Sequence, residues 1–272
     1  MKLWKTLGVL LPAASLLGCD QKSENPSTTA TASAPAMSSA PPAPTPPPPA
    51  TSAAATWTKK LASDCPAHPA TVDFGDQTAL EREVRRKLAK EKGPISPGEL
   101  AQIRSINMTT AGVKEQLHQL DPCIFPMFTS LKDLFLPPGE YEDLTPIQKL
   151  STLESLRASS APLKSLRPIE GLKRLDRLDI SHTLVGDDEL KPVGSLVNLT
   201  ELMLDEDPVS DLTPLASLKK LERLSIKKTE VKSLAPLASL KALKFLYIAD
   251  TPVSDISPVQ PLISNGMKLI QN

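Results

Sequence analysis

The chain has 272 residues, with 31 basic and 31 acidic side chains and a formal net charge of zero. This balance provides no general attraction to nucleic acid or to an anionic membrane surface. Aromatic residues make up only 3% of the chain, whereas there are 28 prolines, many of them gathered in one early segment. The composition therefore indicates a chain of unlike segments.

Residues 1–19 have the pattern of an export signal. Lys2 and Lys5 precede an apolar run from Leu7 to Leu17, which is too short to span a bilayer. The run ends in Leu-Leu-Gly-Cys at residues 16–19, which resembles the lipobox of bacterial lipoproteins. That resemblance implies that Cys19 is lipidated after cleavage. The alternative is an ordinary signal in which the cysteine occurs by chance.

Residues 20–58 are rich in proline, alanine, serine and threonine and end in APPAPTPPPPATSAAAT followed by Trp57 and Thr58. Such a segment has too few apolar side chains to offset the entropy of ordering, so it is predicted to be disordered, with an extended proline-rich part. We interpret it as a tether between a membrane anchor and a folded domain. A proline-rich ligand for another domain is the alternative.

Residues 59–102 are predicted to form a helical cap. Leu80, Val84 and Leu88 recur every four residues, which predicts an amphipathic helix from Thr78 to about Gly93. The sequence Ser-Pro-Gly-Glu at residues 96–99 then has the pattern of a capping box with proline at the first helical position. A second short helix is therefore expected directly before the next region.

Residues 103–272 contain a repeated pattern of about seven units. Leu199, Leu221 and Leu243 each open the pattern L-x-x-L-x-L, at intervals of 22 residues. Period-2 apolar residues predict a short strand, and the later apolar residues, three apart, predict a 3-10 or helical return. Earlier units begin at Ile103, Leu131, Leu153 and Leu175. A column of prolines accompanies them at Pro146, Pro168, Pro192, Pro214, Pro236 and Pro258, and its one longer interval places two extra residues in Gly186–Glu189.

These units resemble leucine-rich repeats of the 22-residue, internalin-like kind, and the helices before them resemble that family's N-terminal cap. The resemblance implies an α/β solenoid with short parallel strands on a concave face, 3-10 or irregular turns on a convex face, and an α-helical cap. The chain departs from the family at the asparagine that usually closes the strand turn. That position holds Gly139, Ala161, Thr183, Asp207, Thr229 and Thr251, and looser turns are expected at the glycine and alanine.

Three cysteines are present. If Cys19 carries lipid, Cys65 and Cys123 remain, an even number in an exported protein, and this predicts a disulfide between them. The bridge would close a loop of roughly 58 residues, worth about 4 kcal/mol in the chain-entropy model. Two free thiols are the alternative. No paired Cys or His spacing indicates a metal site.

The residues between the repeat leucines are expected to face the concave surface. Read along the stack, they form bands of one chemical kind, with an aromatic pair in the last band. We interpret ten of them as a protein-binding surface: Arg157, Arg177, Asp179, Glu201, Met203, Asp205, Arg223, Lys227, Phe245 and Tyr247. The alternative is that the charges only solvate the face and pair between neighbouring coils.

No residue pattern indicates chemistry at a catalytic site. His68, His118 and His182 are not spaced for a nucleophile or a metal, and there is no phosphate-binding glycine loop. The acidic runs at residues 187–189 and 205–207 lack the spacing of a calcium loop and are expected to be solvated turns. The chain is therefore predicted to be no enzyme and to need no cofactor.

Together these features predict a lipid-anchored protein of the bacterial cell envelope, facing the periplasm or the cell exterior. Its repeat domain would recognise a protein partner through the concave face, with no role for nucleic acid. The alternative is a structural lipoprotein whose repeats bind cell-wall polymer or act as a spacer between layers.

Overall fold

The computed structural model describes residues 59–109 and 117–271. The predicted export signal, the predicted lipidation site at Cys19 and the predicted tether of residues 20–58 lie outside the described residues. The chain divides into two compact units, and every described residue belongs to the second, Thr56–Asn272. Within the described part, no helix is both long enough and apolar enough to cross a membrane.

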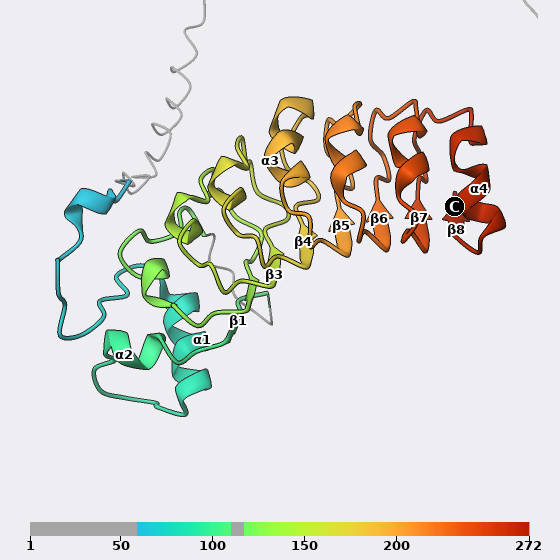
Figure 1. Cartoon of the computed structure of the whole chain (residues 1–272). Helices are drawn as coiled ribbons and strands as arrows, with labels where there is room; N and C mark the ends of the chain where they lie inside the picture. The colour runs from blue at the N-terminus through green and yellow to red at the C-terminus, as the bar shows by residue number, and fades with distance from the viewer. Residues whose placement is uncertain (1–58, 110–116, 272) are drawn as a thin grey trace, which may run out of the picture. The chain divides into compact units, whose positions relative to one another are not determined.

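The described unit contains one parallel sheet of eight strands, in which each strand pairs with the next in sequence (Figure 1). Each strand has three residues, and the interval between paired residues is close to one repeat, for example Leu202 with Leu224. The strands are β1 (Ser105–Asn107), β2 (Asp133–Phe135), β3 (Ser155–Arg157), β4 (Arg177–Asp179), β5 (Glu201–Met203), β6 (Arg223–Ser225), β7 (Phe245–Tyr247) and β8 (Lys268–Ile270). The predicted solenoid of short parallel strands is thus confirmed.

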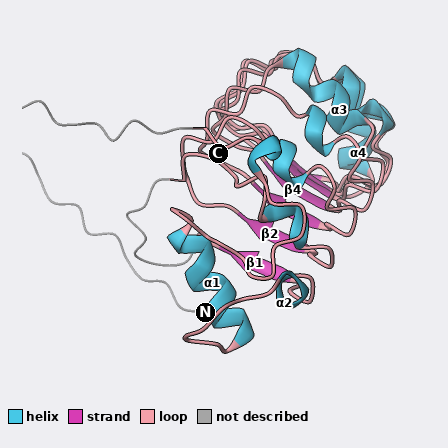
Figure 2. Ribbon diagram, turned by 90° about the vertical axis from the view of Figure 1, so that its left-hand side faces the viewer, coloured by secondary structure: helices cyan, strands magenta, loops and turns pink. Residues whose placement is uncertain are grey.

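Short helices return the chain to the next strand and lie on the other side of the repeats from the sheet (Figures 1 and 2). In most of the 3-10 helices, proline occupies one of the first two positions, where its missing N–H is not needed. The two extra residues at Gly186–Glu189 form a 3-10 turn that leads into an α-helix. The helices are η2 (Phe125–Met127), η3 (Thr145–Ile147), η4 (Arg167–Ile169), η5 (Asp187–Glu189), α3 (Leu190–Gly194), η6 (Thr213–Ser217), η7 (Ala235–Ser239), η8 (Ser257–Val259) and α4 (Gln260–Ser264).

The core is a continuous stack of apolar side chains between the sheet and the helices. The middle residue of each strand from β1 to β7 points into it and is at most 1% exposed, as the leucines of the repeat pattern predict. The opening leucines, such as Leu199 and Leu221, are also fully buried. Each coil thus covers the leucines of its neighbours, and apolar burial is the main force that holds the stack together.

The cap consists of η1 (Ala62–Asp64), α1 (Thr78–Leu88) and α2 (Pro97–Leu100). The first α-helix is shorter than predicted: it ends at Leu88 instead of near Gly93, because Ala89 adopts a left-handed conformation with φ of 50°. The predicted capping box of α2 is confirmed. Glu99 N donates to Ser96 Oγ at 3.3 Å, and Ser96 N donates to Glu99 Oε2 at 2.8 Å.

Helix α1 covers the first strand. Leu80 and Val84 are buried, and the half-buried backbone of β1 donates from Asn107 N to the buried carboxylate of Glu83 at 3.3 Å. Figure 2 shows α1 and α2 beside β1, at the start of the sheet. The cap therefore shields the apolar edge that the first coil would otherwise expose.

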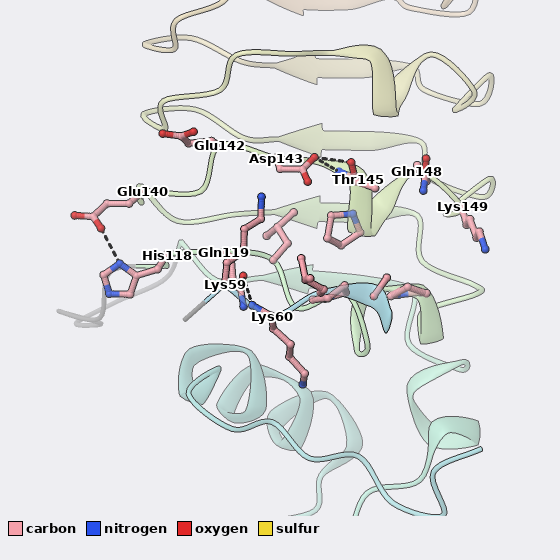
Figure 3. Close-up of a pocket in the computed structure, with 16 residues that line it drawn as sticks. Lys59, Lys60, His118, Gln119, Glu140, Glu142, Asp143, Thr145, Gln148 and Lys149 are labelled. Atoms are coloured by element: carbon pink, nitrogen blue, oxygen red, sulfur yellow. Dashed lines mark hydrogen bonds and ion pairs between the residues drawn. The ribbon is translucent and has the colours of Figure 1, made fainter. Parts of the chain in front are cut away.

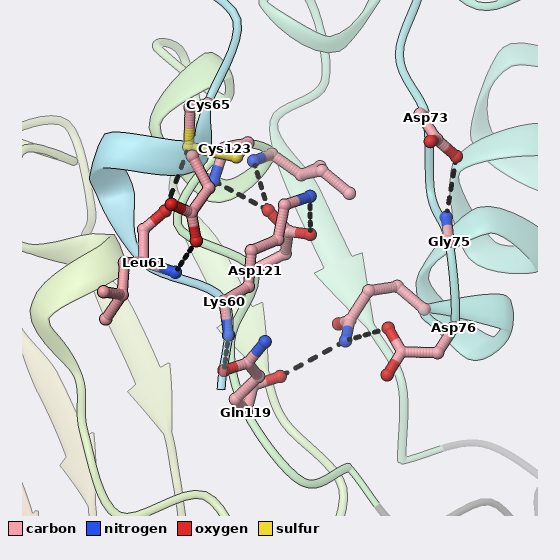
Figure 4. A network of polar contacts seen from close by, with 12 residues as sticks. Lys60, Leu61, Cys65, Asp73, Gly75, Asp76, Gln119, Asp121 and Cys123 are labelled. Carbon is pink, nitrogen blue, oxygen red and sulfur yellow. Dashed lines mark hydrogen bonds and ion pairs between the residues drawn. A yellow bond between two sulfur atoms is a disulfide. The ribbon is translucent and has the colours of Figure 1, made fainter. Parts of the chain in front are cut away.

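The disulfide between Cys65 and Cys123 is present, with an S–S distance of 2.09 Å (Figure 4). It joins the segment after η1 to the loop before η2 and so closes a loop with a sequence separation of 58. The predicted pairing of Cys65 with Cys123 is thus confirmed.

The sheet has one strand more than the seven repeats predicted. Strand β8 pairs with β7 through Leu246 and Leu269, an interval of 23 instead of 22. The pattern was missed because Asn265 stands where the next repeat would place its opening leucine. Leu269 is only partly buried, unlike the middle residues of the other strands.

Replacement of Leu224 by alanine is expected to lower the free energy of unfolding by roughly 2–5 kcal/mol, because the side chain is fully buried between two neighbouring coils. The loss should also broaden the unfolding transition, since it weakens the contact between the two halves of the stack. Urea unfolding followed by circular dichroism measures both effects. The matched control is Leu184→Ala, because Leu184 is 57% exposed and its loss should change stability by about 0.5 kcal/mol or less. Equal effects of the two variants would contradict the assigned core.

Candidate functional site

The candidate site is the outward side of the sheet, which we call the strand face: the first and third residues of β1–β8. Successive side chains of a strand point to opposite sides, so burial of the middle residue turns its two neighbours outward. The parallel register then aligns these residues in columns. The first column runs from Ser105 to Lys268, and the third runs from Asn107 to Ile270.

Eight of the ten residues predicted to bind a partner lie on the strand face, and the other two, Asp205 and Lys227, stand two positions after the ends of β5 and β6. A hollow of about 180 Å³ lies on this face across β2–β5. Its outward-facing lining includes Phe135, Arg157, Arg177, Asp179, Glu201 and Met203. Five of the predicted residues thus share one concavity, and Phe135 adds an aromatic surface to it.

Most charges of the predicted bands are paired between neighbouring coils. Asp179 binds Arg157 with 2.9 Å between Oδ2 and Nε. The acidic and basic bands meet in the same way: Asp205 binds Lys227 at 3.0 Å, and Glu201 lies 3.6 Å from Arg223. Arg177 is held more loosely, with its nearest carboxylate oxygens at 3.8 and 3.9 Å. The pairing considered as an alternative therefore exists, and it leaves Arg177 the most available of these cations.

The aromatic pair occupies β7, near the other end of the strand face. The guanidinium carbon of Arg223 lies 5.1 Å from the ring centre of Phe245, and Lys268 Nζ lies 5.7 Å from it. Both distances suit a cation–π contact. Tyr247 projects from the same strand and is half-buried. Lys268 was missed in the sequence because β8 was missed, so the aromatic end is more basic than predicted.

After each strand from β3 to β7, one residue that is not glycine adopts a left-handed backbone conformation. These residues are Ser160, His182, Glu206, Lys228 and Asp250, and their φ angles lie between 55° and 62°. They form a column of their own, in which Glu206 binds both neighbours: His182 at 3.1 Å and Lys228 at 2.6 Å. The hydrogen bond from Lys228 is the main cause that lowers the pKa of Glu206.

Asp207 is buried, whereas a solvated turn was predicted for residues 205–207. The residue is 2% exposed. Its Oδ1 accepts hydrogen bonds from Thr183 N at 2.6 Å and Thr183 Oγ1 at 2.9 Å, while its Oδ2 has no partner among the described residues. Burial raises the pKa of this carboxyl to about 7, the bonds from Thr183 oppose the rise, and the charges of Asp179 and Asp205 add to it. The error arose because an acidic run is expected to be solvated, although the position of Asp207 in the coil points inward.

The described residues contain no group of His, Cys, Asp and Glu side chains arranged to hold a metal ion. His182 is exposed and bound to Glu206. The acidic run at 187–189 has a structural contact: Asp187 accepts hydrogen bonds from the backbone of Ser210 and Asp211, at 2.7 and 2.9 Å. The strand face presents charged, aromatic and thioether side chains, which are suited to non-covalent contacts.

The fold and its face define the class: this chain carries a leucine-rich-repeat solenoid with a helical N-terminal cap, of the kind found in internalins. Internalin C2 of Listeria monocytogenes is similar in structure, with a TM-score of 0.56 and 24% sequence identity over 71% of this chain and 92% of that one. Internalin InlF of the same species matches with a TM-score of 0.58 and 22% identity, over 71% of this chain and 62% of that one. No protein-family model and no curated protein matches the sequence.

Asp207→Asn is expected to stabilise the protein at high pH. The raised pKa of Asp207 means that the folded state favours the protonated carboxyl, so this contribution to stability is complete below about pH 4 and is lost as pH rises through about 7. The loss amounts to roughly 4 kcal/mol at most, taken from the difference between the folded and ordinary pKa. Urea midpoints at pH 5 and pH 8 measure it.

The asparagine variant should exceed the wild type in stability at pH 8 and differ less at pH 5. Asp250→Asn serves as the control, because Asp250 is an exposed residue that follows β7, two coils beyond Asp207. If the wild type and Asp207→Asn show parallel stability profiles between pH 5 and pH 8, then Asp207 does not titrate in this range.

Proposed function

We propose that this protein is a lipid-anchored recognition module of the cell envelope that binds a protein partner through its strand face. The observation that carries the proposal is the composition of that face. It presents an aromatic pair on β7 and a hollow with Phe135 and Met203, on a sheet whose other outward residues are mainly polar or charged. Exposed aromatic and methionine side chains are enriched where proteins bind one another.

The geometry of the repeats supports this role. A leucine-rich-repeat solenoid displays one side chain of each column per coil, so the strand face is a wide and rigid surface that needs little ordering on binding. The leucine-rich-repeat fold itself suggests a protein-interaction module. Ion pairs such as Arg157 with Asp179 hold the charged side chains in place, so that a partner meets a fixed pattern of charge.

A spacer role is the second candidate, and the same ion pairs favour it. Asp205 with Lys227 and Glu206 with Lys228 satisfy much of the charge internally, as on a face that only has to remain soluble. Under this role, the length of the proline-rich segment would matter and the chemistry of the face would not. The paired charges also mean that affinity for a partner would depend on the aromatic and thioether groups more than on these lysines.

The anchor belongs to the same proposal. The lipobox-like residues 16–19 and the proline-rich segment of residues 20–58 support a lipid on Cys19, followed by a tether. A lipidated N-terminus would hold the solenoid at a membrane of the cell envelope, on the periplasmic or the outer side. Catalysis is no part of the proposed role, and neither is nucleic acid.

Phe245→Ala combined with Tyr247→Ala is expected to weaken binding to the partner by at least 2 kcal/mol, roughly thirtyfold, because buried aromatic side chains carry most of the energy of such contacts. The partner is obtained by crosslinking in the native host and identified by mass spectrometry. Surface plasmon resonance against the purified partner then gives the affinity. The matched control, Leu184→Ala with Val197→Ala, removes two exposed apolar side chains outside the strand face. Wild-type affinity in a folded aromatic double variant would favour the spacer role.

Cys19→Ser is expected to release the protein from the membrane fraction, because serine cannot form the thioether that attaches the lipid. The wild-type protein should show an intact mass for a chain that begins at Cys19 plus acyl groups. Cys65→Ser serves as the comparison, since Cys65 is bridged to Cys123 and has no place in the anchor. A mature wild-type chain that begins at Cys19 without acyl mass would exclude the lipid anchor.

A further inference from the structure

A second cavity lies away from the strand face, along the flank of the first coils. It is a groove of about 560 Å³ between the segment Lys59–Ala62 and the loops at residues 118–126 and 140–149. None of its lining residues belongs to the hollow on the strand face. Figure 3 shows Glu140 and His118 at one end of this lining and Lys149 at the other. The groove is thus elongated and separate from the proposed partner surface.

One wall of the groove is fixed in place. The segment Lys59–Ala62 crosses the flank of the repeats, and the disulfide between Cys65 and Cys123 ties it down just beyond its end. Lys60 Nζ binds the buried carboxylate of Asp121 at 2.8 Å, and Lys60 N donates to Gln119 Oε1 at 3.2 Å (Figure 4). The wall therefore keeps its position without an occupant, which lowers the entropy lost on binding.

The lining has an apolar middle. Pro122, Pro126 and Pro146 are only partly buried, and Leu61 is 55% exposed at the wall. Leu61 is one of just three large apolar side chains that are exposed in the described part of the chain. An exposed leucine and three prolines in one lining offer apolar surface for an aliphatic side chain.

The groove contains two lysines without a partner among the described residues, whereas each of its carboxylates has one. Its carboxylates are engaged: Glu140 with His118 at 2.7 Å, Glu142 with Lys164 at 2.9 Å, and Asp143 with the backbone of Thr145 at 2.8 Å. By contrast, Lys59 and Lys149 have no ion pair or hydrogen bond within the described residues. An incoming carboxylate would thus find two free ammonium groups and would displace no existing contact.

We propose that this groove is a second binding site, which takes an extended segment of a partner protein carrying aliphatic side chains flanked by acidic residues. The aliphatic side chains pack between Leu61 and the prolines, and the acidic side chains bind Lys59 and Lys149. The site is independent of the strand face, so it stands even if the proposed recognition role of that face fails.

Three synthetic peptides test the proposal on the full-length, ¹⁵N-labelled protein by NMR titration. The first is acetyl-Ala-Glu-Leu-Pro-Leu-Glu-Ala-amide, and the other two carry glutamine or lysine in place of both glutamates. The acidic peptide should shift the backbone signals of Lys59–Ala62 and of residues 142–149, and it should bind at least fivefold more tightly than the glutamine peptide. The lysine peptide should bind most weakly, because its charge repels the two free ammonium groups.

Lys59→Gln with Lys149→Gln should abolish the difference between the acidic and the glutamine peptide. Lys232→Gln with Lys241→Gln is the matched control, because it removes two exposed lysines elsewhere on the repeats and should leave the difference unchanged. Leu61→Ser should weaken both peptides at least threefold. Phe245→Ala with Tyr247→Ala should have no effect, which separates this site from the strand face.

Any of four results would overturn the proposal. The first is that the peptides cause no shifts at millimolar concentration, and the second is that the strongest shifts fall on the strand face. The third is that the acidic and glutamine peptides bind the wild type equally. Equal losses in the two double-lysine variants would also overturn it, since the effect would then reflect net charge instead of the groove.

Discussion

Burial of the strand leucines between neighbouring coils is the constraint on which the rest of the structure depends. A coil with a three-residue strand encloses no core of its own, so Leu156 is covered by the coil of Leu134 on one side and that of Leu178 on the other. The first coil lacks such a neighbour. Helix α1 takes that place against β1, and the disulfide holds the cap segment after η1 to the loop before η2. The cap, the disulfide and the stacked repeats therefore all serve to keep the leucine core covered.

The same stacking determines which side chains of the strand face contact one another. Neighbouring parallel strands lie about 4.8 Å apart, so each outward side chain contacts the residue one repeat away more readily than its neighbours in sequence. Whether charges pair is thus decided by the residues that stand 22 or 24 positions apart, as for Glu206 with Lys228 and with His182. An aromatic residue on such a face has no partner of its own kind unless the neighbouring coil supplies one. Phe245 is instead contacted by Arg223 and Lys268, and both Phe245 and Tyr247 are half-buried.

The sequence was informative where the period was regular. Leucine spacing predicted β1–β7 and their buried middle residues, and the proline column predicted the short helices, because one residue type has one role in every coil. Prediction failed where a position departs from the period. Strand β8 was missed because the interval from Leu246 grows to 23, and Asp207 was misplaced because a carboxylate stands at an inward position. The flank groove was missed because it joins Lys59–Ala62 to residues more than fifty positions later, and no repeat relates the two.

The position that holds asparagine in the repeats this chain resembles shows how far one coil depends on the next. At Thr229 and Thr251 the hydroxyl donates to a carbonyl of its own coil, Ile226 O and Ile248 O, at 2.7 and 2.8 Å. At Gly139 a side chain is excluded, since a Cβ would collide with the carbonyl oxygen of Leu117; this turn is tight, not loose. Thr183 instead donates from its backbone N and its hydroxyl to Oδ1 of Asp207 in the next coil. A donor in one coil is thus matched to an acceptor in the next, so that threonine and aspartate act as a pair across the stack. Such a pair forms only when both coils are in place, like the leucine contacts, although Oδ2 of Asp207 stays without a partner among the described residues.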